Sequence, residues 1–235
     1  MLNVIIPTLN AEETLAKTLD SIRAGGGNLP HEVLVVDGGS GDATPTIAAA
    51  RGAKVLSSAP GRGRQLAMGA AAAIAAQATA ADPPWLLFVH ADSLLPTDWA
   101  DTVQPFITPE RNRERAGYFR LGFDGTPDPR ARRVARLANW RADVLGLPYG
   151  DQGVLIHATL YMDVGGFRVE QNLMEDVDLV RRIGPMRLTR LSATVTTSAV
   201  RYRQGGWWGR PLRNVVCLGL YVLGAPNRWI ERLYR

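Results

Sequence analysis

The segment LNVIIPTLNAEE, residues 2–13, decides the fold, because an apolar run passes within a few residues into a polar loop and a helix start. Residues 2–6 predict a buried strand. Asn10 is predicted to cap a helix over about residues 11–23, with Glu13 as its capping-box partner three positions later. A strand that leads directly into a helix indicates an α/β fold.

Strand and helix signals keep alternating through the first hundred residues. The further strands are expected at 32–36, 54–57 and 85–89, and the further helices at 44–51 and in the Ala-rich run 66–81. This alternation predicts a mostly parallel, Rossmann-like sheet flanked by helices. Three loops, 7–12, 37–42 and 90–93, then follow the carboxyl ends of strands, and at that edge open α/β sheets bind ligands.

The second half of the chain is less regular. It is expected to hold a strand at 116–123, an Arg-rich helix at 129–146, a loop through 150–152, an apolar segment at 153–158 and a helix at 175–183. No internal repeat and no flexible linker separates the halves. We therefore expect one domain, with a nucleotide-sugar-binding half (1–100) fused to an acceptor and catalytic half (101–200) and followed by a basic, aromatic, helical tail (201–235).

Composition narrows the class of protein. The 235 residues are 46% hydrophobic and 21% charged, which is typical of a globular rather than a disordered chain. The single cysteine, Cys217, excludes an intrachain disulfide and a multi-cysteine metal site, and we expect it to be a small buried hydrophobe. With no secretory signal and no apolar run of the ~18 residues that a spanning helix needs, the sequence predicts a cytoplasmic protein.

The positive charge is concentrated in the tail. Residues 201–235 hold seven arginines and one acid, a charge of +6. Because the whole chain has a net charge of +5, the other 200 residues carry −1. Together with its aromatic residues, this tail suits peripheral contact with the inner face of the cell membrane, contact with a pyrophosphate through Arg201 and Arg203, or a solvated surface over core aromatics. Nucleic acid is not expected as a partner, because no binding motif accompanies the charge.

Two carboxylates stand directly after strands. Asp37 can accept hydrogen bonds from a ribose or a base edge, although an Asp before two glycines is also a common turn residue. Asp92 suits a hard divalent cation bridging a diphosphate. His90, two positions earlier, is a candidate metal ligand, a candidate hydrogen-bond donor to phosphate, or a capping residue.

A third acidic group begins the helix at 175–183. Glu175, Asp176 and Asp178 fit the helix dipole, and they equally supply a candidate general base for sugar transfer with inversion. Arg62 and Arg64, set among glycines, are candidates to clamp phosphates. The chain lacks both the P-loop GK[ST] and the G-x-G-x-x-G spacing, which argues against an ATPase and against an NAD enzyme.

Five segments in order resemble the family 2 glycosyltransferases, which have the GT-A fold. They are IPTLNAEE (6–13), VVDGGSGD (35–42), FVHAD (88–92), GGF (165–167) and EDVDL (175–179). Three more, GRGRQ (61–65), GDQG (150–153) and TS (197–198), resemble a small bacterial branch labelled arsenosugar-biosynthesis or radical-SAM/selenodomain-associated glycosyltransferase.

The resemblance implies an inverting transfer from a nucleotide-diphosphate sugar, most often a UDP-sugar, to a small-molecule or lipid hydroxyl, assisted by Mn2+ or Mg2+. It also implies a role for each matching residue. The nucleotide pocket would be lined by Pro7, Thr8, Asn10 and Glu12, with Asp37 at the uracil or ribose and Arg64 near the nucleoside or diphosphate. Asp92 would hold the metal, Asp176 would be the base with Glu175 as substitute, and Gln152 and Asp151 would lie where donor sugar and acceptor meet.

The sequence departs from the family pattern at two places. Residues 37–40 read DGGS where the family has Asp-Asp-Gly-Ser, and His90 replaces the first acid of Asp-Ala-Asp. With one carboxylate fewer, the cation is expected to be held mainly by Asp92 and the diphosphate. An imidazole ligand at His90 would favour Mn2+ over Mg2+.

Two rival functions remain open. A nucleotidyltransferase also pairs an α/β sheet with a metal carboxylate, but the sequence lacks a Gly-rich, Lys-containing loop after the first strand. A non-catalytic sugar-nucleotide-binding module at the membrane is the other. The joint presence of Asp92, Glu175 and Asp176 argues against it.

Overall fold

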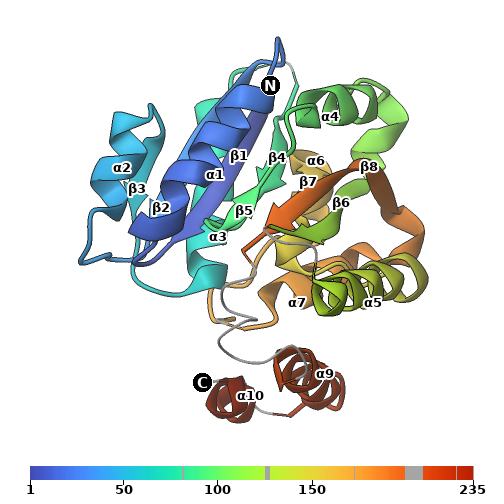
Figure 1. The fold of residues 1–235 in the computed structure, drawn as a ribbon. Coiled ribbons are helices and arrows are strands. Elements are labelled where there is room, and N and C mark those ends of the chain that lie inside the picture. Colours follow the sequence, from blue (N-terminus) through green and yellow to red (C-terminus); the bar gives the residue numbers. More distant parts are fainter. Residues whose placement is uncertain (81, 125–127, 172, 199–208, 226, 235) are drawn as a thin grey trace.

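The structure, a computed structural model, describes residues 1–235 except 81, 125–127, 172, 199–208, 226 and 235 (Figure 1). The predicted diphosphate contacts Arg201 and Arg203 lie outside the described residues. Of the helices described, none has the length and apolar character required to cross a bilayer.

One eight-stranded sheet organises the described chain, in the order β3-β2-β1-β4-β7-β6-β8-β5. Its strands are β1 (Leu2–Thr8), β2 (His31–Asp37), β3 (Lys54–Ser57), β4 (Trp85–Phe88), β5 (Ser93–Leu94), β6 (Ala116–Phe123), β7 (Val154–His157) and β8 (Leu188–Thr197). The first four strands of that order are parallel. Strand β7 runs antiparallel to both β4 and β6, and so joins the two expected halves in one sheet.

The described helices cover both faces of this sheet or, at the C-terminus, lie below it (Figure 1). They are α1 (Glu12–Gly25), α2 (Thr44–Ala50), α3 (Arg62–Ala76), α4 (Trp99–Ile107), α5 (Pro129–Leu145), α6 (Ala158–Asp163), α7 (Glu175–Ile183), α9 (Gly209–Val222) and α10 (Asn227–Tyr234), with short 3-10 turns η1 (Glu110–Glu114), η2 (Gly150–Gln152) and η3 (Pro185–Arg187). In Figure 1 the C-terminal helices α9 and α10 lie below the sheet, at the end to which β1 points. The predicted α/β class is therefore confirmed.

The alternation of side chains along β1 builds a core on each face. Val4 and Ile6 pack with α1, α2 and α4, whereas Ile5 packs with α3, α6 and α7. Such strands, apolar on both sides, are what a sheet covered on both faces requires. Cys217 of α9 is fully buried against Met174 and Val177, as the sequence predicted.

Two local expectations were wrong. Asn10 does not cap α1: the N-cap is Ala11, without a side-chain hydrogen bond, and Asn10 has a left-handed backbone (φ 50°). Its side chain is used across the sheet edge instead. The sequence interpretation also missed β8, whose alternating, half-polar pattern carries little strand signal.

Candidate active site

A pocket of about 540 Å³ opens at the carboxyl ends of β1 and β4. This volume lies in the usual range of small-ligand sites. The pocket is lined by residues 7–11, Glu13, Thr14, Gly61, Arg62, Gln65, residues 90–92 and Ser198. Of the residues predicted to bind the donor or metal, Pro7, Thr8, Asn10, His90 and Asp92 are therefore together in it.

The two loops after β1 and β2 are held together by reciprocal hydrogen bonds. The amide of Asn10 donates to Ser40 Oγ (2.8 Å), and Asn10 Oδ1 accepts from the amide of Gly41 (2.9 Å). Glu12 behaves in the same way, since its Oε2 accepts from the amide of Ala43 (3.1 Å). In this structure Asn10 and Glu12 thus shape the rim, and Glu12 does not itself line the pocket.

Asp37 ends β2 and is the centre of its own turn. Its carboxylate accepts from Thr8 Oγ1 (3.0 Å), from the amides of Gly39 and Ser40, and from the Ser40 hydroxyl. Burial acts to raise the pKa of Asp37, but the hydrogen bonds from Ser40, Thr8 and Gly39 outweigh it and hold the pKa below its usual value. Asp37 is consequently an ionised, well-bonded support beneath Thr8.

Gln65 is a site residue whose part the sequence interpretation missed. Its side chain is buried, and its Nε2 donates to the carbonyls of Thr8 (2.7 Å) and Val36 (2.8 Å). One amide thus fixes the ends of β1 and β2 and also lines the pocket. The GRGRQ segment (61–65) contains Gln65, but only its arginines were predicted to have a function.

The loop that carries Asp92 is supported from the far edge of the sheet. β5 follows this loop and pairs antiparallel with the end of β8, and Thr197 Oγ1 lies 3.5 Å from the Asp92 carbonyl. Ser198, the next residue, lines the pocket. The unpredicted strand β8 therefore positions the metal candidate.

Gly150 brings His90 and Asp176 together. Its amide donates to Asp176 Oδ2 at 2.5 Å, and a Cβ placed on Gly150 would lie 2.5 Å from His90 Nε2 and 3.2 Å from Asp176 Oδ2. The other oxygen of Asp176 accepts from the amide of Val177 (2.7 Å). The predicted base thus lies beside the loop that carries the predicted metal ligands, with both oxygens oriented by backbone donors.

Asp151 belongs to the same cluster of carboxylates. Burial raises its pKa to about 6, Arg141 acts against this rise, and the charges of Asp176 and Asp92 add to it. Its Oδ1 is buried without a hydrogen-bond partner among the described groups. Asp151 is therefore close enough to sense both predicted functional carboxylates, and it is a second candidate proton acceptor.

Glu175 pairs with Arg62 at the pocket wall. Arg62 Nη1 lies 3.2 Å from Glu175 Oε1, and the carboxyl is almost fully buried. Burial raises the pKa of Glu175 to about 7; Arg62 opposes this rise and Asp176 adds to it. Glu175 thus positions Arg62, which lines the pocket, and titrates close to neutral pH.

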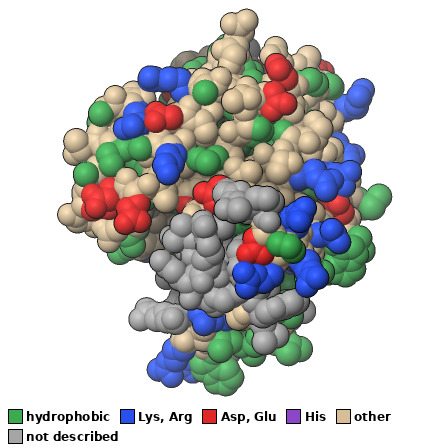
Figure 2. Space-filling view, viewed as in Figure 1, with side chains coloured by type: hydrophobic (Ala, Val, Ile, Leu, Met, Phe, Trp, Pro, Cys, Tyr) green, Lys and Arg blue, Asp and Glu red, His purple; other side chains and the backbone are tan. Residues whose placement is uncertain are grey.

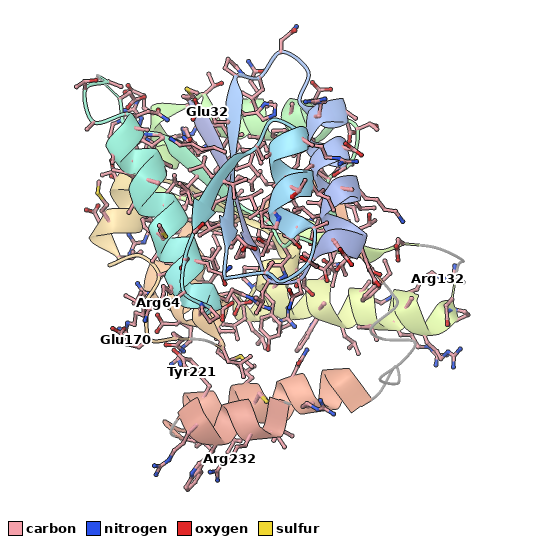
Figure 3. All side chains as sticks on the ribbon, turned by 90° about the vertical axis from the view of Figure 1, so that its left-hand side faces the viewer. Glu32, Arg64, Arg132, Glu170, Tyr221 and Arg232 are labelled. Atoms are coloured by element: carbon pink, nitrogen blue, oxygen red, sulfur yellow. The ribbon has the colours of Figure 1, made fainter. Side chains whose placement is uncertain are left out.

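Two predicted donor contacts are placed differently. Gln152 is fully buried and its amide bonds to Phe119 O (3.1 Å), Asn139 and Arg141, so the side chain is used inside the fold rather than at the pocket. Arg64 is exposed on the outer side of the first turn of α3 (Figure 3). The pocket-facing arginine of this pair is Arg62.

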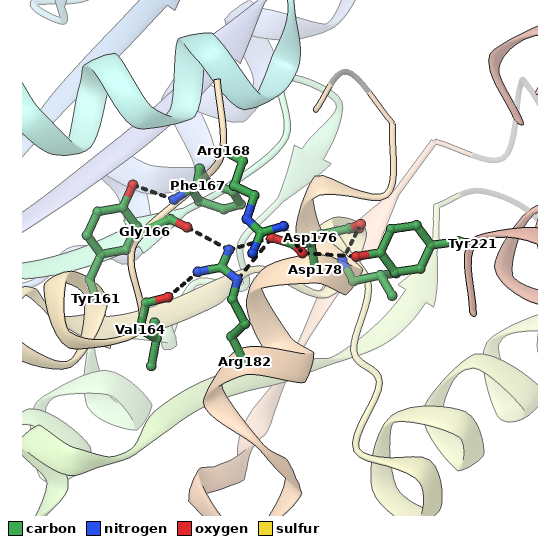
Figure 4. A network of polar contacts seen from close by, with 10 residues as sticks. Tyr161, Val164, Gly166, Phe167, Arg168, Asp176, Asp178, Arg182 and Tyr221 are labelled. Carbon is green, nitrogen blue, oxygen red and sulfur yellow. Dashed lines mark hydrogen bonds and ion pairs between the residues drawn. The ribbon is translucent and has the colours of Figure 1, made fainter. Parts of the chain in front are cut away.

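Asp178, the third acid of the motif, has a structural role. It accepts from Arg182 (Nε, 3.0 Å) and from the Tyr221 hydroxyl (2.9 Å), and Arg182 also binds the carbonyls of Val164 and Gly166 (Figure 4). This network ties the Gly-Gly turn to α7 and fastens α9 to the helix that carries Asp176.

The side chains that could bind a metal fit a cation that is held mostly by the phosphates of a bound nucleotide. Among the described residues no group of three or more His, Cys, Asp or Glu side chains is arranged to hold a metal ion. Asp92 and His90 line the pocket, and Asp151 keeps a buried, unpartnered oxygen nearby. One or two protein ligands completed by phosphate oxygens and water are a usual arrangement for Mg2+ at a nucleotide.

Comparison with known proteins assigns the family. Residues 3–193 match the sequence model of glycosyl transferase family 2. The chain belongs to this family. A curated relative, the glucosyl-3-phosphoglycerate synthase of Mycolicibacterium smegmatis, is 44% identical over 55 residues, which are 23% of this chain and 18% of that protein.

Solved structures of the family share the fold of this family 2 chain. The glucosyl-3-phosphoglycerate synthase of Mycobacterium tuberculosis, solved with Mn2+, UDP and glucosyl-3-phosphoglycerate, aligns with a TM-score of 0.58 and 22% identity over 96% of this chain and 81% of that one. A mannosyltransferase of Pyrobaculum calidifontis, in complex with GDP-Man and Mn2+, aligns with a TM-score of 0.63 and 19% identity over 99% and 68%. The predicted GT-A fold is thereby confirmed.

Proposed function

We propose that this chain transfers a sugar, with inversion, from a nucleotide-diphosphate sugar to an acceptor hydroxyl. The observation that supports the proposal is the contact of Gly150 with both His90 and Asp176, which brings the proposed base beside the loop that lines the candidate donor pocket. The two relatives solved with UDP and with GDP-Man support a nucleotide-sugar donor, and we favour a UDP-sugar.

Each group in the site has a part in this reaction. The rim loops of Asn10 and Glu12 and the Asp37 turn shape the nucleoside end, and Arg62 supplies positive charge beside the diphosphate. Asp92 and His90 are the residues that would hold Mn2+ or Mg2+, and the ion would neutralise charge on the leaving diphosphate. Asp176 accepts the proton of the attacking hydroxyl as the new glycosidic bond forms and the bond to the diphosphate breaks.

Asp151 is the competing base, because it shares the carboxylate cluster and keeps an unpartnered oxygen. Asp176→Asn and Asp151→Asn separate the two assignments. We expect Asp176→Asn to lower donor turnover by roughly 10²- to 10⁴-fold while nucleotide binding stays within a few-fold. Full turnover in Asp176→Asn would overturn the assignment, and loss in Asp151→Asn alone would transfer the role to Asp151.

The sugar donor has to be identified before the turnover of these variants can be compared. UDP-, GDP- and dTDP-sugars are screened with Mn2+ by the rise in Tm, since a ligand that binds the native state raises it. Release of pyrophosphate from a nucleoside triphosphate and a sugar phosphate would favour a nucleotidyltransferase instead.

The tail 201–235 is proposed as a peripheral contact with the cytoplasmic membrane face, beside a lipid or small-molecule acceptor. Truncation after residue 224 tests this contact, because it removes α10 and keeps the contacts of Cys217 and Tyr221 with α7. Vesicle binding should fall while turnover of a soluble acceptor is retained. Loss of turnover with unchanged vesicle binding would contradict it.

A further inference from the structure

Helix α5 carries large apolar side chains on the face that points away from the protein. Leu137, Trp140 and Val144 are 57%, 53% and 61% exposed. Their spacing of three and four positions puts them on one stripe. The opposite face is docked to the core, since Ala138 is buried and Asn139 exchanges two hydrogen bonds with the backbone of Leu121.

This arrangement is the reverse of an ordinary surface helix, which is polar on its outer face. The stripe takes no part in the buried core, because the buried residues of α5 are Ala131, Ala138, Asn139 and Ala142. A contiguous exposed apolar stripe of this kind marks a surface that binds something apolar.

Three exposed arginines lie beside the stripe. Arg133 and Arg136 stand four positions before Leu137 and Trp140, and the exposed Arg132 directly precedes Arg133 in the sequence. The acids at the two ends of α5 are engaged elsewhere, because Asp128 pairs with Arg130 (3.2 Å) and Asp143 with Arg190 (2.6 Å). Within the described part of the chain, no ion pair is found for these three arginines, so their charge faces outward with the stripe.

Exposed apolar residues and exposed arginines also occur together on the C-terminal helix α10. In α10, Trp229 and Leu233 are exposed together with Arg228 and Arg232. Figures 1 and 3 agree in placing α5, α9 and α10 at the same end of the molecule. Figure 2 shows basic side chains gathered at this end, with apolar side chains among them, and the basic residues of α5, α9 and α10 are all arginines.

We propose that α5 binds the surface of an anionic lipid bilayer, with Leu137, Trp140 and Val144 in the acyl boundary and Arg132, Arg133 and Arg136 against lipid phosphates. Apolar residues flanked by arginines on one face are what interfacial helices use. A second copy of this chain fits less well, because in a symmetric pair the three arginines of α5 would meet those of its partner. The proposal extends the membrane contact from the tail to the folded domain, and it rests on the proposed function only for the idea that the acceptor lies near lipid.

The test measures vesicle binding by the full chain without donor, acceptor or metal, so a failure of the proposed transfer does not affect it. Sedimentation is compared for phosphatidylcholine vesicles and for vesicles containing phosphatidylglycerol. We expect binding to the anionic vesicles that weakens with added salt, and a loss of about tenfold or more in the triple variant Leu137→Gln/Trp140→Gln/Val144→Gln.

A matched control replaces three exposed apolar residues outside α5, Met68→Gln/Met162→Gln/Val169→Gln, and should bind as the wild type does. Circular dichroism and Tm verify that both variants remain folded. Trp140→Phe should keep the binding but lose the quenching of tryptophan fluorescence by brominated lipid that Trp140 contributes.

Equal binding by the α5 variant and the wild type would overturn the proposal, as would equal binding to neutral and anionic vesicles. Concentration-dependent dimerisation that the α5 triple variant abolishes, without vesicle binding by the wild type, would also overturn it and assign the stripe to self-association.

Discussion

The amide of Gly150 donates its hydrogen bond to Oδ2 of Asp176, and so fixes the first turn of α7 to the loop after α5. The same glycine touches the imidazole of His90. Three segments far apart in sequence therefore meet at one α-carbon. Any side chain at this position must displace a proposed catalytic group.

Gly150→Ala should separate these groups. The new Cβ would lie 2.5 Å from His90 Nε2, which no real contact allows, so His90 or the loop must shift. Because displacements of about 1 Å in a site cost roughly 10²-fold in rate, we expect kcat to fall by roughly 10- to 100-fold with nucleotide binding little changed. Gly219→Ala, whose Cβ would meet nothing within 4 Å, is the control. Wild-type kcat in Gly150→Ala would show that the contact is irrelevant to transfer.

His90→Ala should change the metal preference. If the imidazole is a ligand, its removal weakens the site more for Mn2+ than for Mg2+, and the ratio of the two activities should fall by about tenfold. His31→Ala, at the opposite end of β2 from the Asp37 turn, should leave the ratio unchanged. Metal titrations of donor turnover provide the measurement, and an unaltered ratio in His90→Ala would exclude the ligand role.

Gln65→Leu should destabilise the protein by about 1–3 kcal/mol, because the buried carbonyls of Thr8 and Val36 each lose a donor. Gln77→Leu, just after the same helix, is the matched control, since Gln77 Nε2 is buried without a hydrogen-bond partner among the described atoms. It should alter stability by about 0.5 kcal/mol or less. Urea unfolding compares the two variants, and equal effects would contradict the bridging role of Gln65.

Glu175→Gln should flatten the pH dependence of stability. Burial raises the pKa of Glu175 from 4.5 to about 7, so the native state binds this proton more tightly than the unfolded state does. The free energy of unfolding should therefore fall as pH rises between about 4.5 and 7, and level off above that range. Asp151, with a pKa of about 6, adds to the same decline.

In Glu175→Gln the decline of Tm across this window should be smaller than in the wild type, with the Asp151 contribution retained. Glu170→Gln, an exposed acid on the loop before α7, is the control and should follow the wild-type curve. A Tm profile for Glu175→Gln that parallels the wild type would show that the carboxyl is not the titrating group.

Local sequence patterns predicted much of the fold. The apolar run of β1 and the motifs around Asp37 and Asp92 lie within short segments, and the order of these segments indicated the family before any contact was known. The bounds predicted for the helix at 175–183 match those of α7, because its acidic first turn and amphipathic period are both local signals. β8 was missed, since its period-two pattern mixes threonines, a serine and one arginine with few large apolar residues.

The sequence by itself determined the fold class, and it predicted the edge of the sheet at which the candidate site lies and the carboxylates near it. Only the tertiary structure decided that Arg62 rather than Arg64 faces the pocket, that Gln152 is used inside the fold, and that Asp151 joins Asp92 and Asp176. The physical reason is distance along the chain: Arg62 and Glu175 are 113 positions apart, and Gly150 and Asp176 are 26 apart. Burial and pKa arise from such long-range packing, and no local pattern encodes them.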